Sequence, residues 1–247
     1  MVVWENQRLC EIESTEENNS LVEDTIGKII ISKVKTDPEK AILKYKKYNS
    51  FRNISRSETL NSMKALFMVL SALGLKQGDR ILFLSENKQQ LITSILSAIS
   101  SGFIAVPVHP EFTYKQIEHI IRDVEPKCLM ISNESQLDKL DKIQNKENIP
   151  VITYDKISDE LLYYKDIIKK FKNTNIDFEK HVVNVDSNNI AYILYDFEQD
   201  GSLLGTILTH KNIISSVKSF IKEFKISEND ISLMHIPVSQ SYSGITE

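Results

Sequence analysis

The chain has few of the residues that cross-link small proteins or interrupt secondary structure. Two cysteines, seven glycines and six prolines occur among its 247 residues. Cys10 and Cys128 lie far apart in the sequence, and neither has a CxxC or Cys/His companion at metal-ligand spacing. This excludes a disulfide framework and a cysteine zinc site. Two unlinked cysteines fit a reducing compartment, so we expect a cytoplasmic protein without a metal site.

A strong net charge and a long apolar run are also missing. The formal net charge is −4 at pH 7, which gives no general attraction to nucleic acid or to an anionic membrane. The short basic run Lys44-Tyr45-Lys46-Lys47 is typical of a solvated helix face or loop. No run reaches the ~18 apolar residues of a membrane span, and Glu5 interrupts the N-terminus, which is untypical of a secretory signal. We therefore expect neither a nucleic-acid partner nor a transmembrane segment.

Apolar residues make up 41% of the chain, which is enough for the core of a large domain. The first strong signal follows Ser55, which forms a capping-box pattern with Glu58 ahead of a helical apolar repeat. The residues before residue 38 are largely polar, with weak periodicity in the first part. We therefore divide the chain into a polar lead-in, residues 1–37, and a domain, residues 38–247.

Strands and helices alternate through this domain. The predicted strands are Arg80–Ser85, Phe103–Val108, Cys128–Ser132, Val151–Tyr154, Ile190–Tyr195, Thr206–Thr209 and Ile231–Ile236. The later predicted helices are Lys88–Ser100, Thr113–Val124, Glu134–Gln144, Asp159–Phe171 and Lys211–Phe224, and a polar stretch covers Lys172–Asp186. Strands joined by helices pair in parallel through right-handed crossovers. The pattern therefore predicts an α/β fold, a doubly wound and mostly parallel sheet with flanking helices.

Four segments in this domain carry a recurring set of glycines, prolines and polar residues: GLKQGDRILFLSENKQQ, SGFIAVPVHPEFT, YDFEQDGSLLGTILTH and LMHIPVSQ. In this order they resemble the N-terminal part of the adenylate-forming (AMP-binding) enzymes, and most of all the long-chain acyl-CoA synthetases. The residues that match in the first two segments are Gly74, Gly78, Asp79, Arg80, Asn87, Gly102, Val106, Pro107, Pro110 and Thr113. The resemblance implies a fold that is incomplete relative to the family's N-terminal domain, and an ATP-dependent acyl-CoA ligase as the family activity.

The third segment stands where the family has its phosphate-binding loop, Y-T-S-G-T-T-G-x-P-K-G-V-x-L-T-H. Small residues in that loop let backbone N–H groups and hydroxyls approach phosphates, and its lysine adds a cation. The resemblance implies a degenerate cofactor-binding set in which the family letters persist at Tyr195, Gly201, Gly205, Thr209 and His210. In a doubly wound sheet this loop would follow the carboxyl end of a strand, where ligands bind.

Other positions of the same segment depart from the family pattern. Asp196, Glu198 and Asp200 add three negative charges, and Leu204 stands where the lysine belongs. Like charges ~4 Å apart repel by roughly 1 kcal/mol in water and by more in a less polar site. We therefore assign no catalytic residue and expect no cofactor, with ATP and Mg²⁺ binding only if the family activity survives. In the fourth segment, Gln240 replaces the family histidine and removes a titratable group.

The resemblance also implies that the ribose-binding Asp and the adenylating Lys of the family come after the last residue of this sequence. We expect a truncated or degenerate acyl-CoA synthetase-like domain of fatty acid metabolism, a pseudoenzyme without adenylation activity of its own. One alternative is a fragment of an ATP-dependent long-chain fatty acid–CoA ligase. Another is a scaffold that docks a partner through an open sheet edge. Its candidate partners are an acyl ligand, and a protein partner or second copy that covers the sheet edge after Ile231–Ile236.

Overall fold

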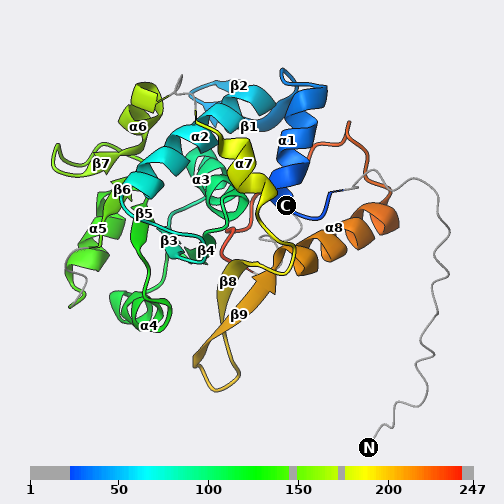
Figure 1. The fold of residues 1–247 in the computed structure, drawn as a ribbon. Coiled ribbons are helices and arrows are strands. Elements are labelled where there is room, and N and C mark those ends of the chain that lie inside the picture. Colours follow the sequence, from blue (N-terminus) through cyan, green and yellow to red (C-terminus); the bar gives the residue numbers. More distant parts are fainter. Residues whose placement is uncertain (1–22, 145–148, 172–175, 241–247) are drawn as a thin grey trace, which may run out of the picture.

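The computed structural model describes residues 23–144, 149–171 and 176–240. Its centre is a seven-stranded sheet in the order β7-β6-β5-β3-β4-β8-β9, in which all neighbouring strands are parallel except β8 and β9 (Figure 1). The strands are β3 Arg80–Leu84, β4 Ile104–Val108, β5 Cys128–Ile131, β6 Val151–Thr153, β7 Leu162–Tyr163, β8 Ile190–Phe197 and β9 Leu203–Thr209. The predicted α/β fold with a mostly parallel sheet is confirmed.

Helices cover both faces of this sheet. They are α1 Ile26–Thr36, α2 Arg56–Ala72, α3 Gln89–Ser100, α4 Tyr114–Val124, α5 Glu134–Asp141, α6 Tyr164–Phe171, α7 Phe178–Val183 and α8 His210–Phe224. Successive strand residues point to opposite faces: Ile81 and Phe83 pack with α1, α2, α3, α6 and α7, whereas Leu82 and Leu84 pack with α4 and α5. None of the described helices has the length and hydropathy needed to cross a membrane.

The strand order creates a switch point between β3 and β5. The chain leaves β3 for β4 through α3 on one face, and it leaves β5 in the opposite direction, for β6, through α5 on the other face. Ligands of doubly wound sheets bind at the carboxyl ends of the strands beside such a point. In this protein Glu86 follows β3 closely, and Asn133 follows β5.

Local sequence explains where two of the long helices begin. The Ser55 hydroxyl accepts the Glu58 N–H and the Glu58 carboxylate accepts the Ser55 N–H, so both halves of a capping box start α2. Thr113 and Gln116 form the same reciprocal pair at the start of α4. Each box satisfies backbone donors that have no partner inside the helix. Both predicted helix starts are confirmed.

The Gly78-Asp79-Arg80 motif has an architectural role. Gly78 has a φ of +86°, a conformation that glycine adopts without steric cost, and it turns the chain into β3. Arg80 then donates from Nε to the Val124 carbonyl at 2.6 Å and from Nη2 to the Glu125 carbonyl at 2.9 Å. These carbonyls lie at the C-terminal end of α4, where cations are favoured. The motif therefore joins β3 to α4, the helix that connects β4 to β5.

Two helices lie in stretches that the sequence indicated only as polar. α1 falls within residues 1–37, yet Ile30 and Ile31 are each only 7% exposed in the core cluster. α7 falls within Lys172–Asp186, and its Phe178 and Val182 are fully buried. In α1, Ile26, Ile30, Ile31 and Val34 recur at helical spacing and pack against the core, a signal that the sequence offered, whereas α7 buries only two residues, which is too few for one. The division of the chain at residue 37 stays a prediction.

Three other sequence predictions are wrong. Leu162–Tyr163 pairs with β6, so the helix predicted over Asp159–Phe171 begins only at Tyr164. The basic run after Leu43 lies in a strand, because β1 Ala41–Lys47 pairs antiparallel with β2 Ser50–Ser55. The strand predicted over Ile231–Ile236 is not formed. Among the described strands none pairs with it, and its Ile231 and Leu233 are 81% and 80% exposed.

Candidate functional site

The segment that resembles a phosphate loop folds as a closed β-hairpin. β8 and β9 pair antiparallel as far as Phe197 and Leu203. The Glu198 N–H donates to the Ser202 carbonyl at 2.8 Å, and the Gly201 N–H donates to the Glu198 carbonyl at 2.9 Å. Gly201 has a φ of +83°. These features are those of a short hairpin loop with a left-handed glycine, so the second strand starts at Leu203 and not at Thr206 as predicted.

The acidic side chains of the hairpin bind its own backbone. The Asp196 carboxylate accepts the Phe197 N–H at 2.8 Å. The Asp200 carboxylate accepts the Ser202 hydroxyl at 2.6 Å and the Ser202 N–H at 2.9 Å. Both hydrogen bonds lower the pKa of Asp200, and the bond from the Ser202 hydroxyl has the larger effect. Two amide donors near the turn are therefore bound to carboxylates of the chain and are not free for a phosphate.

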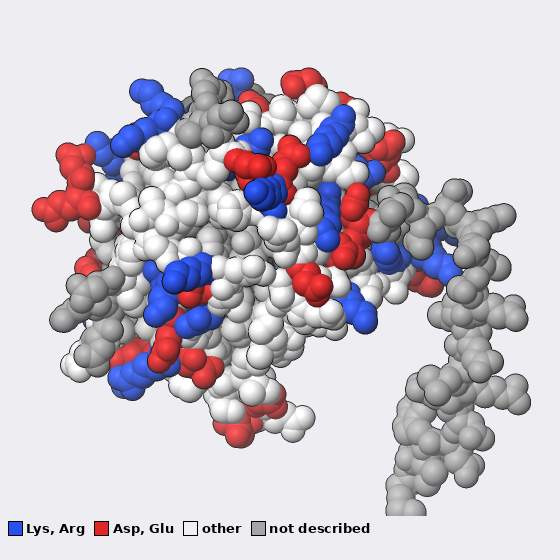
Figure 2. Space-filling view, viewed as in Figure 1, with Lys and Arg blue, Asp and Glu red and all other residues white. Residues whose placement is uncertain are grey.

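The end of the hairpin is negatively charged. Asp196, Glu198 and Asp200 are exposed, and acidic side chains gather at the bottom of Figure 2, where Figure 1 shows the end of the β8–β9 hairpin. No lysine or arginine occurs between Tyr195 and His210. Among the described residues, no cluster of three or more His, Cys, Asp and Glu side chains is arranged to hold a metal ion. The electrostatics of the hairpin are therefore opposite in sign to those of a triphosphate site.

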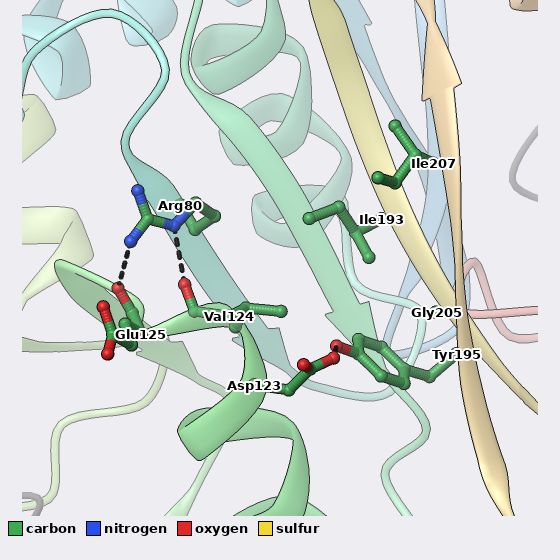
Figure 3. A pocket seen from close by; sticks show the side chains of 8 residues that line it. All are labelled: Arg80, Asp123, Val124, Glu125, Ile193, Tyr195, Gly205 and Ile207. Atoms are coloured by element: carbon green, nitrogen blue, oxygen red, sulfur yellow. Dashed lines mark hydrogen bonds between the residues drawn. The ribbon is translucent and has the colours of Figure 1, made fainter.

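Tyr195 and Gly205 face each other across the hairpin and form a packed pair. A Cβ atom at position 205 would lie 3.0 Å from Cζ of Tyr195 and 3.2 Å from Cγ2 of Ile193, so the ring lies against the glycine backbone. The Tyr195 hydroxyl donates a hydrogen bond to the Asp123 carboxylate of α4 (Figure 3). Burial, and then the negative charge of Asp123, raise the pKa of this hydroxyl. Tyr195 and Gly205, the two residues here that match the family pattern, therefore take part in packing between the hairpin and α4.

A pocket of about 320 Å³ lies beside this tyrosine. It is lined by Arg80, Asp123, Val124, Glu125, Ile193, Tyr195, Gly205 and Ile207 (Figure 3). The Arg80 guanidinium donates to two backbone carbonyls of this lining, and two acidic side chains stand near it. The pocket therefore combines an apolar wall on the hairpin with two carboxylates at the end of α4, Asp123 and Glu125, which outnumber the single guanidinium of Arg80.

Thr209 and His210 lie at the other end of β9, where α8 begins. The Thr209 hydroxyl accepts the Asn212 N–H at 3.2 Å as one half of a capping box. His210 is completely buried, and its Nδ1 accepts the Ile26 N–H at 3.5 Å. Burial lowers the pKa of His210 to about 4, although the charge of Asp24 acts in the opposite direction. The histidine is therefore neutral near pH 7 and links α8 to the start of α1.

The five predicted cofactor residues occupy three separate places. Gly201 lies in the turn, Tyr195 and Gly205 pair in the middle of the hairpin, and Thr209 and His210 lie at the start of α8. At a rise of about 3.4 Å per residue, the four steps from Gly205 to Thr209 span roughly 14 Å. The structure therefore gathers only Tyr195 and Gly205, and the cofactor-binding role of the set stays a prediction.

A polar network beside the switch point was not predicted from the sequence. Glu86 accepts hydrogen bonds from Gln136 Nε2 at 3.1 Å and from Asn133 Nδ2 at 3.4 Å. Gln136 is only 4% exposed and also donates to the Pro110 carbonyl at 3.2 Å. Burial acts to raise the pKa of the Glu86 carboxyl. Hydrogen bonds to the carboxylate outweigh this effect and hold the pKa below its usual value, and the bond from the Ser132 side chain contributes most to the lowering. Polar residues directly after three predicted strands were the available signal, and the network ties those loops together.

Asn87 holds the segment that follows α8 at the same end of the sheet. Its Nδ2 donates to the Ile236 carbonyl at 2.7 Å, and its Oδ1 accepts the Val238 N–H at 3.2 Å. Val238 is only 5% exposed and belongs to the core cluster. The fourth motif is therefore anchored to the first motif through one amide side chain.

The sequence profile of the AMP-binding enzyme family matches residues 32–247. The chain belongs to this family. This AMP-binding family chain is 24% identical over 178 residues to 4-coumarate–CoA ligase 1 of Petroselinum crispum, over 70% of its own length and 32% of the relative's. It is 22% identical over 209 residues to a long-chain-fatty-acid–CoA ligase of Escherichia coli O157:H7, over 73% of its own length and 37% of the relative's. It thus spans about a third of the length of these curated relatives.

Solved structures of adenylate-forming enzymes share the fold. ATP-bound MatB from Rhodopseudomonas palustris superposes with a TM-score of 0.73 at 20% identity, over 90% of this chain and 42% of that protein. A fatty acyl-adenylate ligase from L. pneumophila, in complex with acyl adenylate and pyrophosphate, superposes with a TM-score of 0.65 at 20% identity, over 86% and 35% of the two chains. At this identity the likeness establishes the fold alone.

Proposed function

We propose that this AMP-binding family chain does not form acyl adenylates on its own, and that it acts as a ligand-binding or partner-binding pseudoenzyme related to acyl-CoA synthetases. The observation that carries the proposal is the closed, acidic hairpin at residues 196–202. Tyr195 and Gly205, on either side of this hairpin turn, match the residues of the family pattern, but the contacts that they make here are packing contacts within the protein. The turn donors that a phosphate would need already have partners.

The residues of the hairpin do not fit a triphosphate. Two like charges ~4 Å apart repel by about 1 kcal/mol in water and by about 4 kcal/mol at an effective dielectric constant of 20. Three carboxylates therefore disfavour a polyphosphate beside the turn, and Leu204 supplies no attraction. Carboxylates attract Mg²⁺, but no group of three or more His, Cys, Asp and Glu side chains in the described part of the chain is arranged to hold a metal ion. We therefore expect the isolated chain to use no nucleotide cofactor.

A second candidate function follows from the share of each relative that the chain covers. The chain spans 37% of the E. coli long-chain-fatty-acid–CoA ligase. In this alternative it is one piece of an ATP-dependent long-chain fatty acid–CoA ligase, and ATP, Mg²⁺ and the acyl substrate bind only to the complete assembly. The 22% identity to that ligase supports fatty acids as the substrate class to test first.

Exposed apolar side chains at the end of α8 and in the segment after it support a role in binding a partner. Phe224, Ile231 and Leu233 are 65%, 81% and 80% exposed. Exposed apolar side chains that lie close together often mark a binding surface, whereas single scattered ones are common on any protein. This segment, residues 224–233, is an apolar surface that a protein partner would cover, whereas the scaffold alternative places the partner on an open sheet edge.

ATP–pyrophosphate exchange with a panel of fatty acids tests the proposal. We expect exchange at the level of a control without protein, with Mg²⁺ present and at every acyl chain length. An active long-chain-fatty-acid–CoA ligase, added to the same mixture, shows that the preparation contains no inhibitor. Exchange clearly above the control contradicts the proposal. Exchange that appears only when the remaining part of a related ligase is added as a separate protein supports the fragment alternative.

A further inference from the structure

The outer edge of β9 has no partner among the described strands. β9 is the last strand of the sheet and pairs only with β8. Its sequence, LLGTILT, contains no charged residue and no proline. It therefore lacks the features that usually keep an edge strand from pairing with another chain. Leu204 and Ile207 on this strand are 55% and 56% exposed.

The hydrogen-bond pattern of the hairpin shows which backbone groups point outward. Glu198 and Ser202 form a hydrogen-bonded pair, and such pairs alternate with non-hydrogen-bonded pairs along an antiparallel ladder. In the observed register, every second residue from Ser202 onward therefore bonds to β8. The residues between them, Gly205 and Ile207, direct their N–H and carbonyl groups to the free edge.

We propose that two copies of this chain pair through β9, antiparallel and around a two-fold axis at Thr206. In this register Gly205 of one copy faces Ile207 of the other, and the two residues exchange a pair of backbone hydrogen bonds. The symmetry repeats this pair on the other side of the axis. On the opposite face Leu204 meets Leu208. The strand is self-complementary, because a branched side chain lies opposite a glycine and leucine lies opposite leucine.

This arrangement also covers the pocket beside α4. Gly205 and Ile207 lie on the face of β9 that lines the pocket, together with Tyr195 of β8. An isoleucine from the second copy lies opposite Gly205 and beside the Tyr195 ring that already covers this glycine, so it extends the apolar wall of the pocket. Burying two exposed isoleucines in this way contributes hydrophobic stabilisation in addition to the new backbone hydrogen bonds.

Charge favours the antiparallel orientation of a second copy. In the proposed register residue 201 of one copy lies opposite residue 211 of the other, so the acidic turn meets the first turn of α8. Lys211 is exposed there, and the N-terminus of a helix favours a negative charge. The exposed side chains of Ser215 and Ser216 on the next turn are small and leave room for the turn. A parallel pairing would instead place two acidic turns side by side, at a cost in repulsion.

A cysteine on the proposed axis provides the sharpest test. Facing residues of a non-hydrogen-bonded pair have Cα atoms about 4.5 Å apart, which a disulfide can span. Thr206→Cys, made together with Cys10→Ser, should form a covalent dimer under mild oxidation. Leu204→Cys in the same background is the control, because Leu204 is also exposed on the same face but lies opposite Leu208. Equal cross-linking of the two variants, or none with Thr206→Cys, contradicts the proposal.

Sedimentation equilibrium tests the interface without a cross-link. We expect the unmodified chain to dimerise in the micromolar range, and Ile207→Lys to weaken the association at least tenfold. Ile42→Lys is the matched control, because Ile42 is 40% exposed in β1 and lies outside the proposed interface. A protein that stays monomeric at high micromolar concentration overturns the proposal. So does a dimer that Ile207→Lys leaves unchanged.

A charge exchange tests the register. Glu198→Lys or Lys211→Glu alone should weaken the dimer severalfold, whereas the double variant should recover the original association, because the attraction is restored with the signs exchanged. Added salt should reduce the effect of each single substitution. A double variant that associates more weakly than either single variant contradicts the antiparallel register. None of these measurements depends on whether the chain forms acyl adenylates.

Discussion

The centre of the sheet and the β8–β9 hairpin preserve the family pattern to very different degrees. In β3, β4 and β5 every residue is buried except Arg80, which is partly exposed. In the hairpin, every residue from Asp196 to Ser202 is exposed. Close packing restricts substitutions in the first region, whereas solvent tolerates them in the second. The fold of the family can therefore be retained while the chemistry of an exposed loop changes completely.

One pair of variants measures this difference directly. Phe83 in β3 is 1% exposed, whereas Phe197 in the hairpin is 49% exposed and contacts Phe112 edge to face. Phe83→Ala should lower the free energy of unfolding by about 3–5 kcal/mol, because it removes buried surface and leaves a cavity. Phe197→Ala should cost about 1 kcal/mol or less. Urea unfolding of the two variants provides the measurement, and similar costs would show that the hairpin is as tightly constrained as the core.

His210 connects the two regions, and its titration gives the next largest effect. Because its folded pKa of about 4 lies below the ordinary value, the unfolded chain binds a proton that the folded chain excludes as the pH falls from about 6.5 to 4. Stability is therefore lost across this window, by on the order of 3 kcal/mol from this residue.

Unfolding in urea at pH 7 and pH 4.5 detects this loss. His210→Gln should reduce the difference in stability between the two pH values, although it lowers stability at both. His119→Gln is the control, because His119 is exposed on α4. Carboxylates contribute equally to both variants. An unchanged pH difference in His210→Gln would show that the buried histidine does not link α8 to α1 in the neutral form.

Restoring the family letters in the hairpin tests whether its residues alone exclude nucleotide. The variant replaces residues 196–200 by Thr-Ser-Gly-Thr-Thr and adds Leu203→Pro and Leu204→Lys. It removes three negative charges, adds one positive charge and deletes the carboxylates that occupy turn donors. We expect at least tenfold tighter binding of ATP or pyrophosphate at low salt, a gain that shrinks as ionic strength rises, with no restored catalysis.

Isothermal titration calorimetry on the two proteins at low and high salt provides the measurement. The same replacements at Leu203 and Leu204 alone, with the acidic turn retained, separate the contribution of the added lysine from that of the removed carboxylates. If the complete variant is folded and binds no better than the original chain, the hairpin is not a disabled phosphate loop.

The sequence predicted the parts of the fold that local chemistry determines. The capping boxes at Ser55 and Thr113 and the apolar strand after Gly78-Asp79 gave correct starts for α2, α4 and β3. At the candidate site, the Asp200-Gly201 dipeptide is itself a strong hairpin signal. This dipeptide indicates a closed turn, which the resemblance to a phosphate loop does not.

Contacts between distant parts of the chain could not be predicted in this way. The hydrogen bond from Tyr195 to Asp123 joins residues 72 positions apart, and neither residue has a local pattern that indicates the other. Ile231–Ile236 shows the opposite error. Its apolar residues resemble a strand, but a strand forms only where a neighbour supplies hydrogen bonds, and a single sequence does not reveal whether one is present.

The position of Arg80 has a consequence for the detection of inactive relatives. Its guanidinium holds the last carbonyls of α4, so its loss would disturb a helix end whether or not any nucleotide binds. Selection for a folded chain alone would preserve such a residue, and the glycine turn before it, long after selection for catalysis had ended. A motif of this kind records shared ancestry and architecture, whereas residues in unpacked positions, such as those of the β8–β9 turn, are the ones that can differ between active and inactive members of a family.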